Sequence, residues 1–255
     1  MAYQQRRRRN RGGIDPTLML LLMKLFAQVQ QMPYKPPATL FIMGVNIAVH
    51  LNDTLIPFSI SSVCLHPAQI LFGWDLKRLV LSAFVHADDY HLYYNMSSLL
   101  WKGAQLEQTN GTEEFLKMSA FLLLGSHVIY VLVAWILSML GVFSATMQTC
   151  AVGYSAVLFG YKMVLNYNSP SLSSFYGMMV PLKYMCWVEL VLISIITPNA
   201  SFLGHLCGIL AGLCYLKKEA ILSTLGIRAS RIQRGNLRPP PPRTGFQQQH
   251  NRWRN

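Results

Sequence analysis

Apolar stretches, separated by short polar or proline-containing breaks, run through most of the chain. Several of them are long enough, or extend far enough into their flanks, to cross a bilayer as helices. We place the predicted spans at residues 38–51, 91–106, 115–140, 151–165, 179–196 and 200–216. The pattern therefore predicts an all-α membrane protein with a bundle of six transmembrane helices.

Two segments fall outside this pattern. Residues 17–31 predict a mostly apolar helix that contains Lys24. We interpret it as an interfacial or leading segment, because it is short and polar at its end. The longest connection, residues 52–90, mixes prolines and charges with apolar pieces. Because a structureless loop of that length would be unusual, we expect it to fold in part and to associate with the membrane.

Charge placement predicts the domains and the topology. Most lysines and arginines lie in a basic N-terminal arm and leading helix at 1–37 or in a Pro/Gln-containing tail at 217–255, which we expect to be disordered. The membrane domain at 38–216 lies between them. The loops at 141–149 and 197–201 carry no positive charge. Because positively charged segments stay on the cytosolic side, we expect both termini to be cytosolic.

Composition narrows the class of protein. Hydrophobic residues make up 52% of the chain and charged residues 13%, which argues against a soluble globular domain. The net charge of +12 could suggest a nucleic-acid binder. However, the arginines lie in terminal arms with little aromatic interleaving, and no recognised binding module lies between them. We therefore expect the lipid bilayer as a partner and no nucleic acid, and a cytosolic partner for the C-terminal tail.

The five cysteines are Cys64, Cys150, Cys186, Cys207 and Cys214. Their spacing fits neither a metal site nor a disulfide framework. We expect three of them to lie inside helices and to behave as small hydrophobic residues. Cys64 and Cys150 could both face a non-cytosolic compartment and pair there, and the sequence leaves that pairing open. The histidines lack a convincing ligand set, so we expect neither a metal nor a cofactor.

Two polar residues stand fifty positions apart in apolar, small-residue surroundings: Ser155 within 150–160 and His205 within 204–212. A lone serine in such a helix is commonly a packing residue that bonds to its own turn. An ionisable group in a membrane segment, however, is a functional candidate and needs a partner. Small residues at a spacing of four allow the two helices to approach closely. We therefore predict that Ser155 is a nucleophile and His205 its base.

His91 and Asn95 are four residues apart, which places them on one face of the second predicted span. Asparagine in a membrane bundle often makes only a hydrogen bond between helices. Together with a nucleophile and a base, however, the two side chains would serve as donors to an oxyanion. Glu189 lies in the fifth predicted span, and Asp88 and Asp89 lie in a loop. With no credible third carboxylate, a dyad is the simpler interpretation.

Over roughly residues 38–216 the chain resembles the rhomboid intramembrane serine proteases, in particular the short, six-span endoplasmic-reticulum type. The resemblance rests on His86, His-Leu-Tyr-Tyr-Asn at 91–95, Gly-Tyr-Ser at 153–155 and Gly-His-Leu-Cys-Gly at 204–208. Each motif alone is weak. The last three, in the right order and each on its own predicted span, are a strong signal, and they imply a rhomboid-like bundle.

The resemblance also implies roles for individual residues. The implied site comprises the nucleophile Ser155, the general base His205, the oxyanion donors His91 and Asn95, and the supporting residues Gly153, Phe159 and His86. The backbone N–H of Ser155 completes the implied oxyanion hole. Two positions depart from the family pattern: Ala156 follows the serine where the family has glycine, and Lys77-Arg78 replaces the usual Trp-Arg pair.

The function that we expect is hydrolysis of peptide bonds in or near the transmembrane helices of protein substrates. The expected location is the membrane of the endoplasmic reticulum, as a multi-pass protein. The alternative is a catalytically silent relative that binds client helices without cutting them. Ser155 and His205 argue against that alternative, while Ala156 keeps it open. A transporter or a metalloprotein fits less well, because no His-Glu-x-x-His motif is present.

Overall fold

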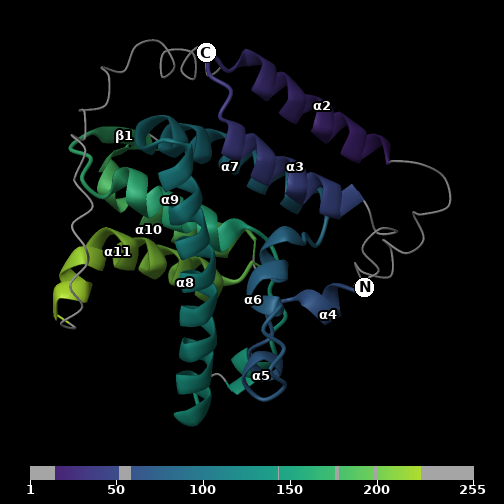
Figure 1. Cartoon of the computed structure of the whole chain (residues 1–255), viewed down its shortest axis with the longest axis vertical. Coiled ribbons are helices and arrows are strands. Elements are labelled where there is room, and N and C mark those ends of the chain that lie inside the picture. Colours follow the sequence, from purple (N-terminus) through teal and green to yellow (C-terminus); the bar gives the residue numbers. More distant parts are fainter. Residues whose placement is uncertain (1–14, 52–58, 143, 176–177, 198–199, 225–255) are drawn as a thin grey trace. The chain divides into compact units, whose positions relative to one another are not determined.

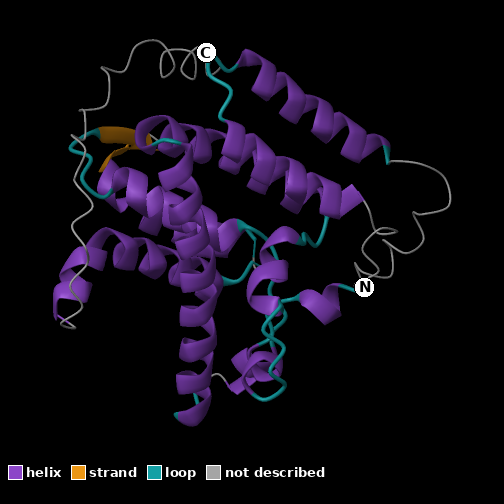
Figure 2. Ribbon diagram, in the orientation of Figure 1, coloured by secondary structure: helices purple, strands orange, loops and turns teal. Residues whose placement is uncertain are grey.

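The computed structural model describes residues 15–51, 59–142, 144–175, 178–197 and 200–224. Helices dominate this part of the chain (Figure 2). The longer ones are α2 (Pro16–Gln31), α3 (Pro37–Leu51), α7 (Asp89–Asn110), α8 (Thr112–Met139), α9 (Ser155–Asn166), α10 (Met185–Ile196) and α11 (Phe202–Thr224). Each predicted span thus has a corresponding helix, although several boundaries differ.

The described part of the long first connection folds into short helices, as its mixed composition predicted. These are α4 (Ile60–Val63), α5 (Pro67–Leu71), α6 (Arg78–Leu81) and the 3-10 turn η1 (Ser82–Phe84). Two further 3-10 turns are η2 (Ser144–Gln148) and η3 (Leu182–Tyr184). The segments α5 and α6 pack against α8, so the connection is part of the folded protein.

Helix α7 is the element around which the others are arranged, because α2, α3, α8 and α9 all pack against it (Figure 1). It begins where the Asp88 side chain accepts a hydrogen bond from the His91 N–H at 2.8 Å, which is a typical N-cap. It ends at Gly111, whose φ of 84° is easily adopted only by glycine. The break between the predicted spans 91–106 and 115–140 is therefore shorter than expected, since α8 starts at Thr112.

Glu107 joins three helices near the end of α7. Its side chain is buried, and its two oxygens accept hydrogen bonds from the N–H groups of Ala38 (2.9 Å) and Thr39 (2.8 Å). The hydroxyls of Thr39 (2.8 Å) and Thr112 (2.9 Å) donate to the same carboxylate. The first N–H groups of a helix have no acceptor within the helix, so Glu107 caps α3 and links it to α7 and α8.

Among the described residues, the departure from an all-α fold is a short antiparallel hairpin that follows the predicted span 151–165 and extends into the predicted span 179–196. Strand β1 (Leu172–Phe175) pairs with β2 (Met178–Pro181), with Leu172 opposite Pro181. The fifth predicted span was expected to begin at residue 179, but α10 begins at Met185 because β2 and η3 occupy the residues before it. Proline cannot continue a helix interior, which explains why no helix runs through this segment.

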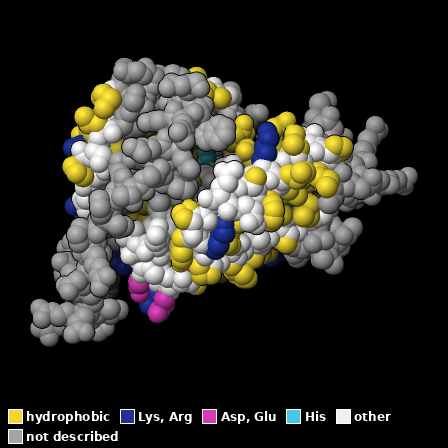
Figure 3. Space-filling model, turned by 90° about the horizontal axis from the view of Figure 1, so that it is seen from above, with side chains coloured by type: hydrophobic (Ala, Val, Ile, Leu, Met, Phe, Trp, Pro, Cys, Tyr) yellow, Lys and Arg dark blue, Asp and Glu magenta, His cyan; other side chains and the backbone are white. Residues whose placement is uncertain are grey.

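One helix in the described part of the chain, α8, is long and apolar enough to cross a bilayer by length and composition, with a mean hydropathy of 2.2. Helix α3 is apolar but shorter. Large hydrophobic side chains are also exposed, among them Phe41, Leu132, Ile136 and Ile195. In Figure 3, apolar side chains form patches on the described part of the face, with scattered charged ones between them. A lipid-facing surface has this character, and the count of six spans stays a prediction.

Contacts divide the chain into two units, residues 1–217 and 218–255. Of the second unit, only 218–224, the end of α11, belongs to the described residues. The predicted basic arm before residue 15 and the predicted Pro/Gln-containing tail after residue 224 lie outside the described residues. The domain limits at 37/38 and 216/217 therefore stay predictions.

Candidate active site

Ser155 is the first residue of α9, not an interior residue of a span beginning at 151 as predicted. The helix starts late because Gly153 has a φ of +110°, in the left-handed region that favours glycine. The residues up to Gly153 therefore approach the helix in a non-helical conformation. As the first helical residue, Ser155 has an N–H group without an acceptor inside α9. That N–H group can donate to an external oxygen.

His205 on α11 lies within hydrogen-bond distance of this serine. Its Nε2 is 3.0 Å from the Ser155 Oγ, and its side chain is buried. The imidazole stacks on the Phe159 ring, with centroids 4.5 Å apart and planes inclined by 24°. Among the described residues, none forms a hydrogen bond with His205 Nδ1. The arrangement is therefore a serine–histidine pair in which an aromatic ring, and not a carboxylate, lies against the histidine.

The pair can form because α9 and α11 approach each other closely. A Cβ at Gly208 would lie 2.0 Å from the Ala156 carbonyl oxygen, and one at Gly212 would lie 2.9 Å from the Gly160 carbonyl oxygen. No larger residue fits at Gly208 without moving a helix. The small-residue spacing thus predicted the crossing correctly. Ala156, which departs from the family pattern, is buried here, while Gly208 supplies the room for the close approach.

His91 lies beside the segment that precedes the serine. A Cβ at Gly153 would come within 2.7 Å of the His91 Cε1 and Nε2 atoms, so glycine is required on steric grounds as well. The Ala87 N–H points at His91 Nδ1 at 3.4 Å. If Nδ1 accepts this long hydrogen bond, the neutral ring carries its proton on Nε2, the atom next to Gly153. His91 can then act as a donor on the serine side.

Asn95 and His86 surround His91. The Asn95 Nδ2 donates to the His91 carbonyl oxygen at 2.8 Å, one turn earlier in α7. Since an amide has two N–H bonds, the second stays available to another acceptor. His86 is fully buried and meets the His91 ring edge-on, with centroids 5.0 Å apart. Within the described ranges, no hydrogen bond joins His91 or Asn95 to Ser155, so their role as oxyanion donors stays a prediction.

Glu189, which sequence reasoning set aside, belongs to a charged cluster that the sequence did not reveal. Its carboxylate pairs with the Lys162 ammonium and lies 3.6 Å from the Lys102 ammonium. It is thus engaged by two lysines on α9 and α7. The available signal was a lysine near the end of each of the predicted spans 91–106 and 151–165. In the described part of the chain, no group of three His, Cys, Asp or Glu residues could hold a metal ion.

The Cys64–Cys150 pairing that the sequence left open is present as a disulfide, with the two Cα atoms 5.2 Å apart. Cys186 and Cys207 are buried free thiols, as expected for small hydrophobic residues in helices, and Cys214 is a partly buried free thiol.

One family model and several known proteins match the sequence of this chain. Residues 73–219 match the family model described as the Rhomboid domain. The chain is 46% identical over 222 residues to "Rhomboid-like protein 14, mitochondrial" of Arabidopsis thaliana, which covers 85% of this chain and 65% of the relative. It is 38% identical over 210 residues to "Rhomboid-related protein 4" of Homo sapiens, covering 82% and 64%. The chain thus covers less than two thirds of the length of either relative.

A more distant relative carries an activity in its name. The chain is 29% identical over 146 residues to "Rhomboid-type serine protease 2" of Yarrowia lipolytica, which covers 56% of this chain and 46% of the relative. The family-model match includes all the predicted site residues, from His86 to His205.

Proposed function

Since the chain belongs to the rhomboid family, whose members are membrane proteins and generally intramembrane serine proteases, we propose that it hydrolyses peptide bonds in or near the transmembrane helices of other proteins. The observation that carries the proposal is the 3.0 Å separation of Ser155 Oγ and His205 Nε2, across two helices that meet at glycine contacts. A serine hydroxyl is a weak nucleophile by itself and needs a base at this distance.

In this mechanism, neutral His205 takes the proton from Ser155 Oγ while that oxygen attacks the substrate carbonyl carbon. The tetrahedral intermediate collapses, His205 gives the proton to the leaving amine, and an acyl-enzyme remains. Water, deprotonated by His205, then hydrolyses the ester and regenerates the serine. Because only the neutral imidazole accepts a proton, turnover should rise with pH as His205 loses its proton.

In the tetrahedral intermediate, the oxygen of the substrate carbonyl carries a negative charge, which hydrogen-bond donors have to stabilise. The Ser155 N–H at the start of α9 is one, and His91 Nε2 and the second N–H of Asn95 are the others that we propose. Donors fixed in advance stabilise the charge as it develops and need no rearrangement during the reaction. Phe159 and His86 act on the ring orientations of His205 and His91 respectively.

The second candidate function is that of a silent relative that binds client transmembrane helices without cutting them. What favours it is that the plant and human relatives are named rhomboid-like and rhomboid-related, with no activity in the name. The serine–histidine separation favours the protease, because a binding protein has no need of a base beside a hydroxyl.

We further propose six spans with both termini in the cytosol, transmembrane protein substrates, and a cytosolic partner for the tail. We propose the endoplasmic reticulum as the location. The Cys64–Cys150 disulfide supports an oxidising compartment on its side of the membrane. The name of the plant relative offers the mitochondrion as the competing location. Imaging the tagged chain against markers for both organelles decides between them.

The experiment that tests the function uses purified protein reconstituted in lipid. A fluorophosphonate probe should label the wild type and leave Ser155→Ala unlabelled, and only the wild type should cleave a panel of model transmembrane substrates. Labelling of Ser155→Ala at the wild-type level would remove the case for a serine nucleophile. Labelling of the wild type without cleavage of any substrate would favour the silent relative.

A further inference from the structure

The residues immediately before Ser155 are attached to the folded first connection at several points. The disulfide joins Cys150 to Cys64, which precedes it by 86 residues. Directly beside it, Leu65 and Ala151 form an antiparallel bridge, with N–H to carbonyl distances of 2.8 and 3.1 Å. The covalent bond and the two hydrogen bonds therefore fix two consecutive residues, 150 and 151, against the first connection.

A further attachment lies closer to the serine. The Gly153 N–H donates to the Ser82 carbonyl oxygen at 2.9 Å. On its other side Gly153 contacts the His91 ring, as the 2.7 Å approach of a hypothetical Cβ shows. The position of Gly153 between Ser82 and His91 therefore sets where the chain turns into α9 and where the Ser155 N–H points.

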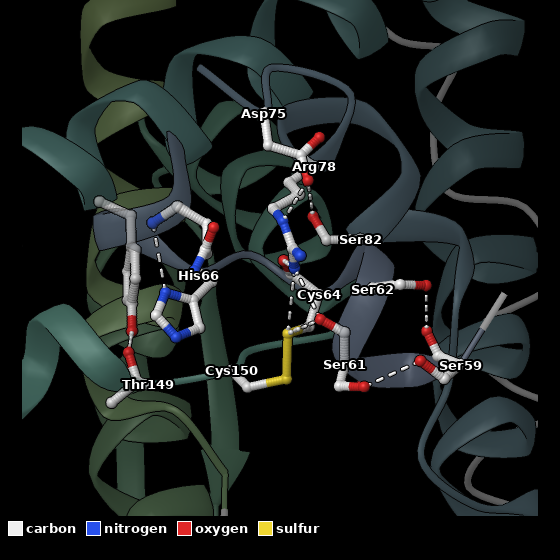
Figure 4. Close-up of a disulfide and its surroundings, with 12 residues drawn as sticks. Ser59, Ser61, Ser62, Cys64, His66, Asp75, Arg78, Ser82, Thr149 and Cys150 are labelled. Carbon is white, nitrogen blue, oxygen red and sulfur yellow. Dashed lines mark hydrogen bonds and ion pairs between the residues drawn. A yellow bond between two sulfur atoms is a disulfide. The ribbon is translucent and has the colours of Figure 1, made fainter. Parts of the chain in front are cut away.

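The part of the first connection that receives these attachments is itself held by several hydrogen bonds. The Arg78 side chain is buried and donates from Nη1 to the carbonyl oxygens of Ser61 (2.8 Å) and Cys64 (3.0 Å). Its Nε donates to Asp75 Oδ2 at 2.9 Å. In Figure 4, Arg78 lies between Asp75 and the disulfide, with dashed lines to both sides. The Ser82 hydroxyl donates to the Arg78 carbonyl oxygen at 2.6 Å, which continues the network toward Gly153.

Asp75 stays ionised in this network at neutral pH. Burial raises the pKa of its carboxyl group, but hydrogen bonds from Lys77 and Arg78 lower it by more, so the pKa lies below its usual value. The guanidinium of Arg78 thus keeps its counter-charge, and the Cys64 carbonyl oxygen keeps its donor. The backbone at Cys64 is consequently held in place by Arg78. The disulfide then restricts the position of Cys150 relative to it.

We propose that the Cys64–Cys150 disulfide is a positioning element for catalysis, which holds the segment 150–153 so that Gly153 keeps the Ser155 N–H and the His91 ring directed at the reacting carbonyl. The proposal rests on the proposed function. The hydrogen bonds at Leu65 and Gly153 are individually weak and can open, because water competes for backbone groups once a segment loosens. The covalent bond prevents that opening. Activity should therefore require the oxidised cysteine pair.

The test compares oxidised and reduced wild-type protein in lipid nanodiscs. A water-soluble trialkylphosphine supplies two electrons: the S–S bond breaks, two thiols form with protons from water, and the phosphine leaves as its oxide with the oxygen of that water. Because a displacement of about 1 Å can cost on the order of 100-fold, we expect kcat and the rate of fluorophosphonate labelling to fall by roughly 10-fold or more. KM should change by less than about 2-fold, since the segment does not bind the distant parts of the substrate.

Matched variants separate the disulfide from other thiol effects. The double variant Cys64→Ser/Cys150→Ser should have the low rates of the reduced wild type and should not respond to the phosphine. Cys214→Ser, which removes a free thiol, should retain both the wild-type rates and the response. Reoxidation of the reduced wild type should restore its rates.

Hydrogen exchange gives a readout that does not depend on activity. In the reduced protein, exchange should accelerate in peptides covering 150–155 and remain unchanged in peptides from the middle of α8. Unchanged rates after complete reduction would overturn the proposal, and so would accelerated exchange throughout the protein, which would mean general destabilisation. If wild-type protein neither cleaves nor labels, the proposed function fails. The catalytic positioning role fails with it, and local acceleration of exchange at 150–155 would then show only that the disulfide holds this segment in place.

Discussion

Two of the polar clusters among the described helices share the helix α9. The first is the Ser155–His205 pair, joined by one hydrogen bond of 3.0 Å. The second, the lysine–glutamate cluster, consists of Lys102, Lys162 and Glu189. Seven residues separate Ser155 from Lys162, which is about 10 Å along the helix. Similar apolar surroundings therefore hold a hydrogen-bonded pair and a cluster of acidic and basic side chains close together.

The two clusters differ in how completely their polar atoms are bonded. In the lysine–glutamate cluster, one carboxylate meets two ammonium groups, and Lys102 also donates to the Ser98 hydroxyl at 2.8 Å. Around the pair, by contrast, His205 Nδ1 and Asn95 Oδ1 are buried without a hydrogen-bond partner among the described residues. A structural cluster in an apolar interior has to pair its charges. A reactive site has to keep some groups available for the substrate.

The largest expected effect comes from removing either member of the pair. Ser155→Ala and His205→Ala should each lower cleavage of a transmembrane substrate by on the order of 10⁴-fold or more, and the double variant should be no worse, because members of one catalytic unit are not additive. Steady-state cleavage by purified, reconstituted variants measures this.

Ser194→Ala is the matched control for that prediction. Ser194 bonds to the Leu190 carbonyl oxygen at 2.7 Å, as a packing serine in an apolar helix does. Its replacement should leave turnover close to wild type. Equal losses in Ser155→Ala and Ser194→Ala would mean that Ser155 is a packing residue too, and the distinction between the two clusters would then disappear.

The next effect in size concerns the donors beside the pair. Asn95→Ala should lower kcat by on the order of 10²–10³-fold and leave measurable turnover, since it removes one oxyanion donor and neither reacting group. A comparison of kcat with KM checks this, because a donor that acts in the transition state should affect kcat. A loss as complete as that of Ser155→Ala, or a change in KM alone, would contradict the role of Asn95 as a donor.

Disruption of the lysine–glutamate cluster should affect stability more than chemistry. Glu189→Gln leaves two lysines without their carboxylate, and the cost should be about 2 kcal/mol, less than for a fully buried pair because the Glu189 side chain is 26% exposed. Denaturation in mixed micelles measures the free energy of unfolding, and turnover per folded molecule should stay within a few-fold of wild type.

Glu113→Gln provides the comparison for Glu189→Gln. Glu113 pairs with Lys117 on α8, where its side chain is 83% exposed, so its replacement should have no measurable effect on stability. If Glu189→Gln were as stable as wild type but lost most of its activity, the lysine–glutamate cluster would belong to the catalytic site.

The sequence predicted the pair more successfully than the cluster, for a physical reason. Ser155, His205 and the glycines of α11 form short local motifs with a fixed spacing, and the spacing alone indicates a close helix crossing. The lysine–glutamate cluster depends on contacts among three helices, and a lysine near a helix end usually reaches the solvent or the lipid headgroups. No local pattern distinguishes the lysines that instead turn toward a carboxylate.

The helix boundaries could be predicted less well, because the backbone conformation of single residues and the pairing of short strands decide them. The start of α9 at Ser155 depends on the positive φ of Gly153, and hydropathy does not report φ. The hairpin before α10 depends on pairing between β1 and β2, which a polar loop composition does not reveal. The disulfide was left open because its cysteines lie 86 residues apart and become neighbours only when the first connection folds.

The smallest expected effect concerns the aromatic ring that is stacked on the histidine of the pair. Phe159 stacks on His205 with centroids 4.5 Å apart. Contacts of this kind contribute about 0.5–1.5 kcal/mol beyond burial, so Phe159→Leu should lower kcat by up to roughly 10-fold. Single-turnover cleavage rates measure the chemical step without interference from product release.

Phe159→Tyr keeps the stacking ring, so it should keep most of the activity that Phe159→Leu loses. Phe159 is buried, and a leucine there also loses packing volume, so the unfolding free energy of both variants has to be compared with wild type. The ring orients His205 if kcat falls in Phe159→Leu while the fraction of folded protein at the assay temperature stays unchanged. If kcat is unchanged in that folded variant, the helix crossing alone orients His205. The Ser155–His205 pair would then resemble the lysine–glutamate cluster in depending only on where the helices place its members.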